Sequence, residues 1–241
     1  MKAAAIVLAA GKGVRMKSDL PKVSHSLCGK PMIVRVLKSI DELELEAVYV
    51  VVGYKADIVK SECEDFDVTY IEQNEQLGTG HAVMQARPFV KEPLVIVLNG
   101  DVPLLKPETL RNLISYHVSK SASATILTAS VPDPTGYGRI IRTDDGLIVR
   151  IVEHKDATAN ELGIDEINTG TYCFNTKELF DALNDVKPNN AQKEYYLTDV
   201  ISILRKKGSP VYAYKASDHI EVLGVNTKED LIKLEDYCTN A

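Results

Sequence analysis

The sequence predicts an α/β fold built on a doubly wound, mostly parallel sheet. Apolar runs alternate with amphipathic stretches through the first half of the chain. In these runs apolar and polar residues do not alternate, as they would in a strand with only one buried face. This pattern is expected for strands covered on both faces. The alternation of such runs with amphipathic stretches is typical of βαβ units. A chain of 241 residues is also long enough to bury a full core.

The first half supplies most of these segments. The first strand is expected at Ala3–Leu8, which is a continuous apolar run. The first helix is expected at 31–43, where Pro31 suits the first turn and apolar residues recur at helical spacing. The remaining segments are strands at 47–52, 68–71, 93–98 and 124–129, helices at 56–62 and 107–120, and a loop leading into a helix at 78–86.

The second half predicts a smaller, β-rich part. Runs at 139–142 and 147–152 flank Asp145-Gly146, whose residue types favour a two-stranded hairpin. Further strands are expected at 167–174 and 211–214, and helices at 179–183, at 197–205 and from 226 to the end. No linker composition separates the halves, so we expect one domain. Its last helix, 227–241, either packs on this domain or begins an arm toward another.

Composition and charge argue against several classes of partner. The net charge of −6 argues against nucleic acid or an anionic membrane as the main partner, although a local cationic pocket could still bind a small anion. No apolar run approaches the roughly 20 residues of a membrane span. The N-terminus leads into the first strand without a signal-peptide pattern, so we expect a cytoplasmic protein. Scattered cysteines without paired spacing are expected to be reduced thiols, namely Cys28, Cys63, Cys173 and Cys238.

The loop after the first strand carries the first candidate site. Gly11 and Gly13 permit a sharp turn whose N–H groups can point at an anion, and Arg15 and Lys22 add two cations. Together these residues predict polyphosphate binding, whereas a plain surface turn would explain the glycines alone. A dinucleotide fingerprint would need a third glycine at the position of Met16, and the Walker A pattern is absent.

A second candidate site follows the strand expected at 93–98. Asn99 and Asp101 stand at its carboxyl end, which is where open α/β sheets bind ligands. A carboxylate there suits Mg²⁺, because this ion prefers oxygen ligands. An aspartate that merely opens a turn is the common alternative.

Several stretches, in order along the chain, resemble one family. The residues Leu8–Met16 (LAAGKGVRM), followed by Leu20–Lys22 (LPK), are similar to the signature of sugar-nucleotide pyrophosphorylases. Further stretches resemble the uridylyltransferase domain of the bifunctional bacterial enzymes of this family that make UDP-N-acetylglucosamine. They are Gln76–Ala82, Gly100–Leu104, Pro134–Ile140, 152–157, Glu166–Gly170, Glu194–Asp199 and Gly224–Asn226. The resemblance spans essentially the whole chain. It implies a Rossmann-like fold of the nucleotide-diphospho-sugar transferase type with a smaller sugar-binding part.

The resemblance also implies roles for individual residues. Arg15 would stabilise the leaving pyrophosphate, and Lys22 would hold phosphate oxygens near the α-phosphorus. The protein ligands of Mg²⁺ would be Asp101 and Asn226. The nucleotide would be bound by Leu8, Ala9, Ala10, Gly11, Gly13, Lys22, Gln73, Gly78 and Thr79. The sugar would be bound by Asn99, Gly138, Glu153 and Asn168.

Some of these positions have plainer explanations as well. Gln73 could be an exposed amide at a strand end, and Glu153 could pair with Lys155 at the surface, although its motif favours sugar contact. His81 is expected to pack or cap at a helix start. Some family members carry an aromatic residue where Asn99 stands, which leaves the fine sugar contacts open.

The implied reaction is Mg²⁺-dependent uridylyl transfer from UTP to N-acetylglucosamine 1-phosphate. It would give pyrophosphate and UDP-N-acetylglucosamine, a precursor of the cell wall. Residues 1–130 would bind the nucleotide and 131–226 the sugar. Two alternatives stay open: a nucleotidyltransferase for another sugar 1-phosphate, such as that of glucose or N-acetylmuramic acid, and a catalytically silent module that binds a nucleotide sugar.

The bifunctional relatives also carry a C-terminal β-helix that performs acetyl transfer and forms their trimer. This sequence contains no such hexapeptide repeats, so acetyl transfer is not expected. The chain would be either a separate domain or a natural single-function enzyme, and we expect a monomer.

Overall fold

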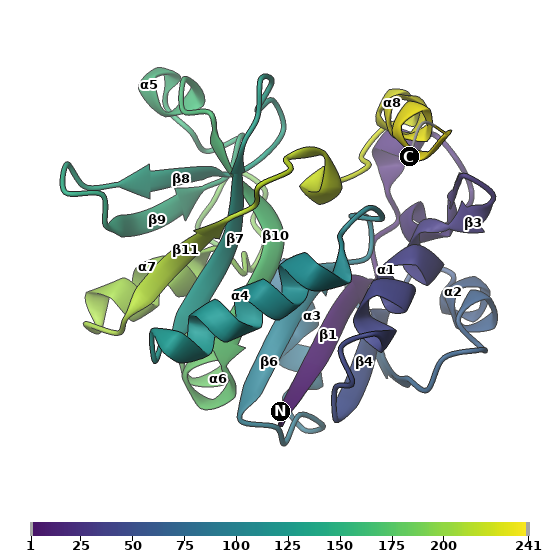
Figure 1. Ribbon diagram of the computed structural model, residues 1–241, viewed down its shortest axis with the longest axis horizontal. Coiled ribbons are helices and arrows are strands. Elements are labelled where there is room, and N and C mark those ends of the chain that lie inside the picture. The colour runs from purple at the N-terminus through teal and green to yellow at the C-terminus, as the bar shows by residue number, and fades with distance from the viewer. Residues whose placement is uncertain (1, 240–241) are drawn as a thin grey trace.

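The computed structural model describes residues 2–239 and, at residues 238 and 239, the backbone alone. Its centre is a sheet with the strand order β11-β7-β10-β6-β1-β4-β5 (Figure 1). These strands are β1 (Ala3–Ala9), β4 (Ala47–Val52), β5 (Thr69–Glu72), β6 (Leu94–Asn99), β7 (Ala124–Ser130), β10 (Glu166–Asn175) and β11 (Val211–Lys215). The hairpin of β8 (Arg139–Arg142) and β9 (Ile148–Val152) extends from β10, and β2 (Ser26–Leu27) and β3 (Lys30–Pro31) form a separate pair. The predicted α/β, Rossmann-like fold class is confirmed.

The first half of the sheet is parallel because helical crossovers connect its strands. β1 pairs in parallel with β4 on one side and with β6 on the other, and β4 pairs in parallel with β5. The chain moves outward from β1 to β5 and then returns to β6 on the opposite side of β1. This reversal makes a topological switch point beside β1, where open α/β sheets bind ligands.

One strand of the second half runs against this direction. β10 lies between β6 and β7 and pairs antiparallel with both, while β11 pairs in parallel with β7. The predicted hairpin forms as β8 and β9 and joins β10 through β8. The sequence did not reveal the direction of β10, because a buried strand has the same apolar pattern whether it pairs parallel or antiparallel with its neighbours.

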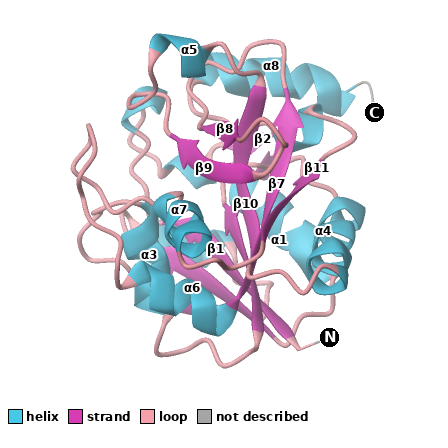
Figure 2. Cartoon of the chain, turned by 90° about the vertical axis from the view of Figure 1, so that its left-hand side faces the viewer, coloured by secondary structure: helices cyan, strands magenta, loops and turns pink. Residues whose placement is uncertain are grey.

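Two separate sets of helices cover the two faces of the sheet, while α5 and α8 lie away from these faces (Figure 2). The helices are α1 (Met32–Asp41), α2 (Ala56–Glu62), α3 (Thr79–Ala86), α4 (Pro107–Ser119), α5 (Ala159–Leu162), α6 (Thr176–Leu183), α7 (Asp199–Lys206) and α8 (Lys228–Thr239). The buried apolar side chains of α2 and α4, and those of α1 apart from Met32, belong to one core, and those of α3, α6 and α7 belong to the other. Along β1, Ala4 and Ile6 enter one core while Ala5 and Val7 enter the other, as the period of a strand requires.

Helix α8 packs beside the loop that follows β1. Met16, Leu27, Met32, Val225 and Leu234 form a small buried cluster apart from the two main cores. Met16 belongs to the glycine-containing loop after β1, and Leu234 lies on α8. The described part of the tail therefore supports the loop, and residues 240 and 241 of the expected helix lie outside the described residues.

Several short elements were not expected from the sequence. They are β2, β3, α5 and the 3₁₀ helices Val14–Met16, Lys22–Ser24 and Ile220–Val222. Elements this short escape periodicity arguments, which need windows of about 11 residues or more. Helix α7 also begins at Asp199, two residues later than predicted.

The described cysteines are free thiols, as expected. Cys63 and Cys173 are buried, while Cys28 is partly exposed. Burial raises the pKa of Cys63 to about 12 and also raises that of Cys173, so neither thiol forms a thiolate readily at neutral pH. The expectation for Cys238 concerns a side chain outside the described residues.

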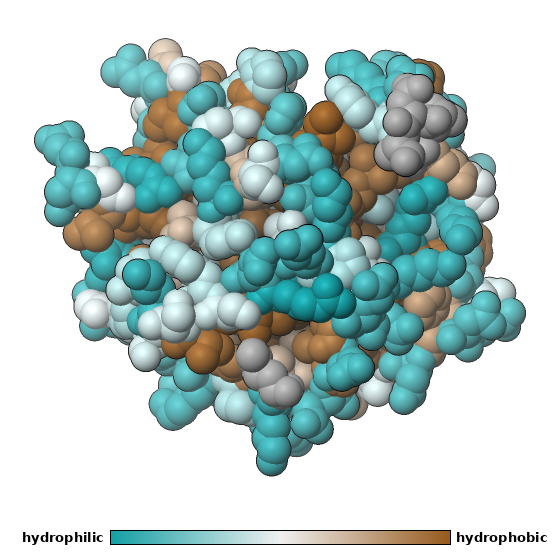
Figure 3. All heavy atoms as spheres, in the orientation of Figure 1, coloured by the Kyte–Doolittle hydropathy of each residue, from teal (hydrophilic) through white to brown (hydrophobic). Residues whose placement is uncertain are grey.

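The surface shows no membrane-spanning element within residues 2–239, since none of their helices has the length and apolar character that a bilayer crossing needs. The face shown in Figure 3 is mainly hydrophilic, with small apolar patches between polar side chains.

Candidate active site

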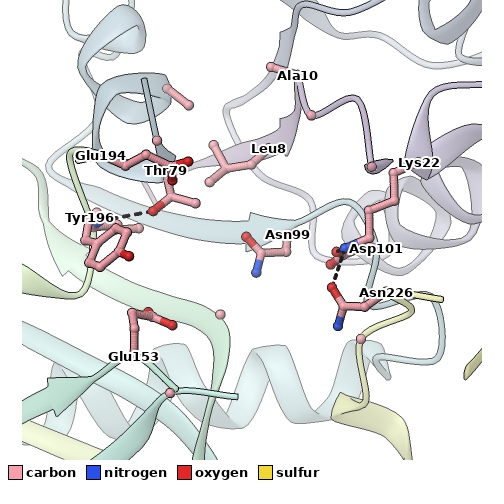
Figure 4. Close-up of a pocket in the computed structure, with 18 of the residues that line it drawn as sticks. Leu8, Ala10, Lys22, Thr79, Asn99, Asp101, Glu153, Glu194, Tyr196 and Asn226 are labelled. Carbon is pink, nitrogen blue, oxygen red and sulfur yellow. Dashed lines mark hydrogen bonds and ion pairs between the residues drawn. The ribbon is translucent and has the colours of Figure 1, made fainter. Parts of the chain in front are cut away.

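A pocket of about 510 Å³ opens at the carboxyl ends of β1 and β6, where the switch point lies (Figure 4). Both halves of the chain line it. Most of the residues expected at the site do so: Leu8, Ala10, Gly11, Gly13, Arg15, Lys22, Gln73, Gly78, Thr79, Asn99, Asp101, Gly138, Glu153, Asn168 and Asn226. Ala9 does not, because alternate residues of a strand face opposite sides and its side chain is buried in a main core.

Cations and oxygen ligands converge at one end of this pocket. The ammonium of Lys22 lies between Asp101 Oδ2 and Asn226 Oδ1 and donates to both, at 2.7 Å in the case of Asn226. Arg15 Nη2 donates to the same Asn226 oxygen, also at 2.7 Å. Arg15 and Asn226 are 211 positions apart in the sequence. The two candidate phosphate-binding cations and the two candidate metal ligands thus form one cluster.

Asp101 and Asn226 form a donor set that fits Mg²⁺. Their oxygens face one common cation position, since the charged nitrogen of Lys22 lies between them. One carboxylate and one amide oxygen suit an ion that keeps several waters and also binds substrate phosphates. No group of three or more His, Cys, Asp or Glu that could hold a metal occurs in the described part of the chain. A divalent ion here would therefore complete its coordination with water and, when they are bound, with substrate oxygens.

Gln73 forms part of the wall of the pocket. Its side chain is buried at the end of β5, so it is not an exposed strand-end amide. Its Nε2 donates to Gly78 O at 3.2 Å and lies 2.9 Å from His81 Nδ1. Because Gly78 O can only accept, this bond sets the orientation of the amide. His81 therefore packs at the start of α3 and holds Gln73.

The start of α3 is joined to the segment that precedes α7. A Cβ on Gly78, whose φ is +110°, would lie 2.6 Å from Tyr195 O, so only glycine fits this close approach. Gly80 N donates to Tyr195 O at 2.7 Å, and Thr79 Oγ1 accepts from Leu197 N at 3.1 Å. Two motifs that are distant in sequence thus form one continuous wall.

The opposite end of the pocket is buried and polar. Glu153 follows β9, and its Oε1 accepts from Thr198 Oγ1 at 3.2 Å. Burial raises the pKa of Glu153, and no ion pair with Lys155 occurs among the described residues. Asn168 on β10 donates from Nδ2 to Tyr172 Oη at 2.7 Å. This end therefore offers a carboxylate and an amide held in fixed orientations.

Asn99 lies between these two ends in Figure 4, at the end of β6. Sequence reasoning missed Glu194 and Tyr196, which also line the pocket. The adjacent Tyr195 is not among the lining residues. The segment before α7 has no regular secondary structure, so no periodicity could show which of two adjacent tyrosines faces the pocket.

Comparison with known proteins shows the family of this chain. The model of the nucleotidyl transferase family matches residues 4–235. The chain belongs to this family. A bifunctional protein GlmU of Halalkalibacterium halodurans is 53% identical over 233 residues, which cover 96% of this chain and 51% of that protein. One of Brevibacillus brevis is 52% identical over 235 residues, with coverage of 97% and 51%. The chain thus spans about half the length of the curated relatives it matches.

Solved structures support the fold of this nucleotidyl transferase. A UDP-glucose pyrophosphorylase complexed with UDP-glucose aligns with a TM-score of 0.79 at 17% identity, over 100% of this chain and 99% of that one. HddC from Yersinia pseudotuberculosis aligns with a TM-score of 0.73 at 23% identity, over 98% and 99%. The resemblance read from the sequence motifs is confirmed at the level of the family.

Proposed function

We propose that this nucleotidyl transferase moves a uridylyl group from UTP to N-acetylglucosamine 1-phosphate, with UDP-N-acetylglucosamine and pyrophosphate as products. The observation that carries the proposal is a single pocket with a cationic, oxygen-rich end and a buried polar end. Relatives that are about half identical and are named bifunctional protein GlmU favour this reaction over others of the family.

The cationic end would carry the phosphate chemistry. The sugar phosphate oxygen attacks the α-phosphorus of UTP, and the bond from that phosphorus to the bridging oxygen breaks so that pyrophosphate leaves. The nucleophile is already an anion, so no general base is needed, and catalysis rests on positioning and charge stabilisation. Arg15 would stabilise charge on the pyrophosphate. Lys22 would exchange Asp101 and Asn226 for phosphate oxygens when the substrates bind.

Asp101 and Asn226 would hold Mg²⁺ between them, and the bound ion would neutralise charge on the phosphate oxygens. The family membership and the convergence of the two oxygens support a divalent metal here. Asp101 follows β6 and Asn226 precedes α8, so both halves of the chain would have to be folded for the ion to bind.

The walls of the pocket support the proposal that residues 1–130 bind the nucleotide and residues 131–226 bind the sugar. On the nucleotide side, Gln73 Nε2 is engaged with Gly78 and His81, which leaves Oε1 to accept from the N3–H of uracil. Leu8, Ala10, Gly11 and Thr79 would complete that side. On the sugar side, Glu153 and Asn168 would bind hydroxyl and N-acetyl groups, with Gly138 and Asn99 beside them.

A substrate panel tests this proposal. UTP and dTTP are each combined with the 1-phosphates of N-acetylglucosamine, glucose and N-acetylmuramic acid, and pyrophosphate release is followed with Mg²⁺ and with EDTA. We expect the highest kcat/KM for UTP with N-acetylglucosamine 1-phosphate, and loss of turnover in EDTA that added Mg²⁺ restores. A higher kcat/KM for another pair would mean that this pair, and not UTP with N-acetylglucosamine 1-phosphate, is the substrate pair. Binding of a UDP-sugar without any turnover would show a silent binding module instead.

A further inference from the structure

Tyr137 connects the two ends of the pocket through one hydroxyl group. It lies in the loop between β7 and β8, one residue before Gly138 on the sugar side. Its Oη accepts a hydrogen bond from Gly224 N at 3.0 Å and donates one to Gly224 O at 3.3 Å. One side chain thus satisfies both backbone polar groups of a residue that stands two positions before Asn226.

The backbone on either side of Asn226 has further attachments. Val225 N donates to Asp101 O at 2.9 Å, which ties the segment carrying one candidate metal ligand to the residue carrying the other. Asn226 N donates to Asp230 Oδ2 at 2.9 Å, at the start of α8. Between the 3₁₀ helix at 220–222 and α8 the chain has no helix or strand. Its backbone is held by these hydrogen bonds, and the buried side chain of Val225 adds packing.

We propose that Tyr137 is a positioning residue that holds the Gly224–Asn226 segment so that the Asn226 oxygen stays beside Asp101, ready for the metal ion. This inference rests on the metal site of the proposed function. Without the hydroxyl, the N–H and C=O of Gly224 lose their partner in the protein. The segment could then move, and the Asn226 oxygen would leave the cation position that it shares with Asp101.

The environment of Tyr137 suits this role. Burial raises the pKa of Tyr137 to about 12, so the hydroxyl keeps its proton and can both donate and accept throughout the range in which the protein would be assayed. Asp101, Asp230 and Arg15 are the charged groups that act on this hydroxyl, and each belongs to the cluster around Asn226 or to its attachment.

Tyr137→Phe tests the inference, and Tyr70→Phe is the matched control. Tyr70 Oη also donates to a backbone carbonyl, Lys60 O at 3.2 Å, but it lies on β5 and does not line the pocket. Mn²⁺ binding is measured by electron paramagnetic resonance on the folded proteins, which circular dichroism verifies. We expect Tyr137→Phe to raise the Kd for Mn²⁺ about 10-fold or more, as loss of a group that orients a metal ligand does. Tyr70→Phe should leave it unchanged.

Kinetics supply a second readout, which is the dependence of kcat on the concentration of Mn²⁺. Tyr137→Phe should lower kcat with little change in the KM for UTP, and higher Mn²⁺ concentrations should restore part of kcat. Asp101→Ala separates the two proposals. If Asp101→Ala binds Mn²⁺ as tightly as the wild type, the proposed metal site is wrong and the inference falls with it. If Asp101→Ala loses binding while Tyr137→Phe binds normally, only the role of Tyr137 is overturned.

Discussion

A Cβ on Gly13 would lie 2.5 Å from the Cβ of Lys22 and 3.3 Å from its Cα. The φ of Gly13 is +66°, in the left-handed region that favours glycine. The turn after β1 therefore closes onto Lys22 itself. Because residue 13 has no side chain, the Cα and Cβ of Lys22 can lie close to it, in a position from which the ammonium reaches Asp101 and Asn226.

We predict that Gly13→Ala lowers turnover by displacing Lys22, because the methyl group would collide with a Cβ and not with a flexible chain end. Gly146→Ala is the matched control, since Gly146 has a φ of +84° but open space around it in the β8–β9 turn. Both variants should carry about 1 kcal/mol of backbone strain. Pyrophosphate release measures the turnover of the two variants, and thermal melts measure their stability. An equal kcat for Gly13→Ala and Gly146→Ala would contradict the role of Gly13.

Arg15→Ala and Lys22→Ala should each reduce turnover about 10²- to 10³-fold, as the loss of one preorganised charge contact typically does. Lys22 donates to both candidate metal ligands, and Arg15 shares one of them. Lys38→Ala, which removes an exposed charge on α1, is the control. Circular dichroism checks that the fold is retained. Near-normal turnover in both site variants would show that Arg15 and Lys22 do not take part in the proposed mechanism.

Glu153→Gln should stabilise the protein at neutral pH while weakening sugar binding. A carboxyl whose pKa is raised on folding costs stability above its ordinary pKa of about 4.3, and this cost disappears as pH falls and the group protonates. The variant should therefore melt at a higher temperature than the wild type at pH 7.5, with the difference shrinking toward pH 4. The KM for the sugar phosphate should rise, because an amide N–H would stand where an acceptor is needed. A lower melting temperature at pH 7.5 would show that burial of Glu153 carries no such cost.

His117 should make the protein less stable as pH falls. Its ring is buried on α4, with Nδ1 3.0 Å from Thr125 Oγ1, and burial lowers its pKa to about 4. The unfolded chain takes up a proton near pH 6.5 and the folded protein near pH 4, so stability is lost as pH drops through that window. Urea unfolding at pH 7 and pH 5 measures the effect. His117→Asn should reduce the difference in the free energy of unfolding between pH 7 and pH 5. An unchanged difference would mean that other groups cause the pH dependence.

Much of the fold was readable from local sequence. The alternation of buried strands and amphipathic helices predicted the layers, since burial on one or both faces sets the spacing of apolar residues within a few turns. The position of β10 was not readable, because pairing depends on which distant strand lies alongside. Both the apolar runs and their order are compatible with either direction.

The sequence by itself determined the family, the glycine-containing loop after β1 and the carboxylate just after β6, because each depends on residue types within a short stretch. Only the tertiary structure decided that Gly13 makes room for Lys22, that Tyr196 and not Tyr195 lines the pocket, and that Tyr137 holds Gly224. These relationships join residues that are far apart along the chain. They arise from close packing and from the need to satisfy buried backbone groups, which no local pattern records.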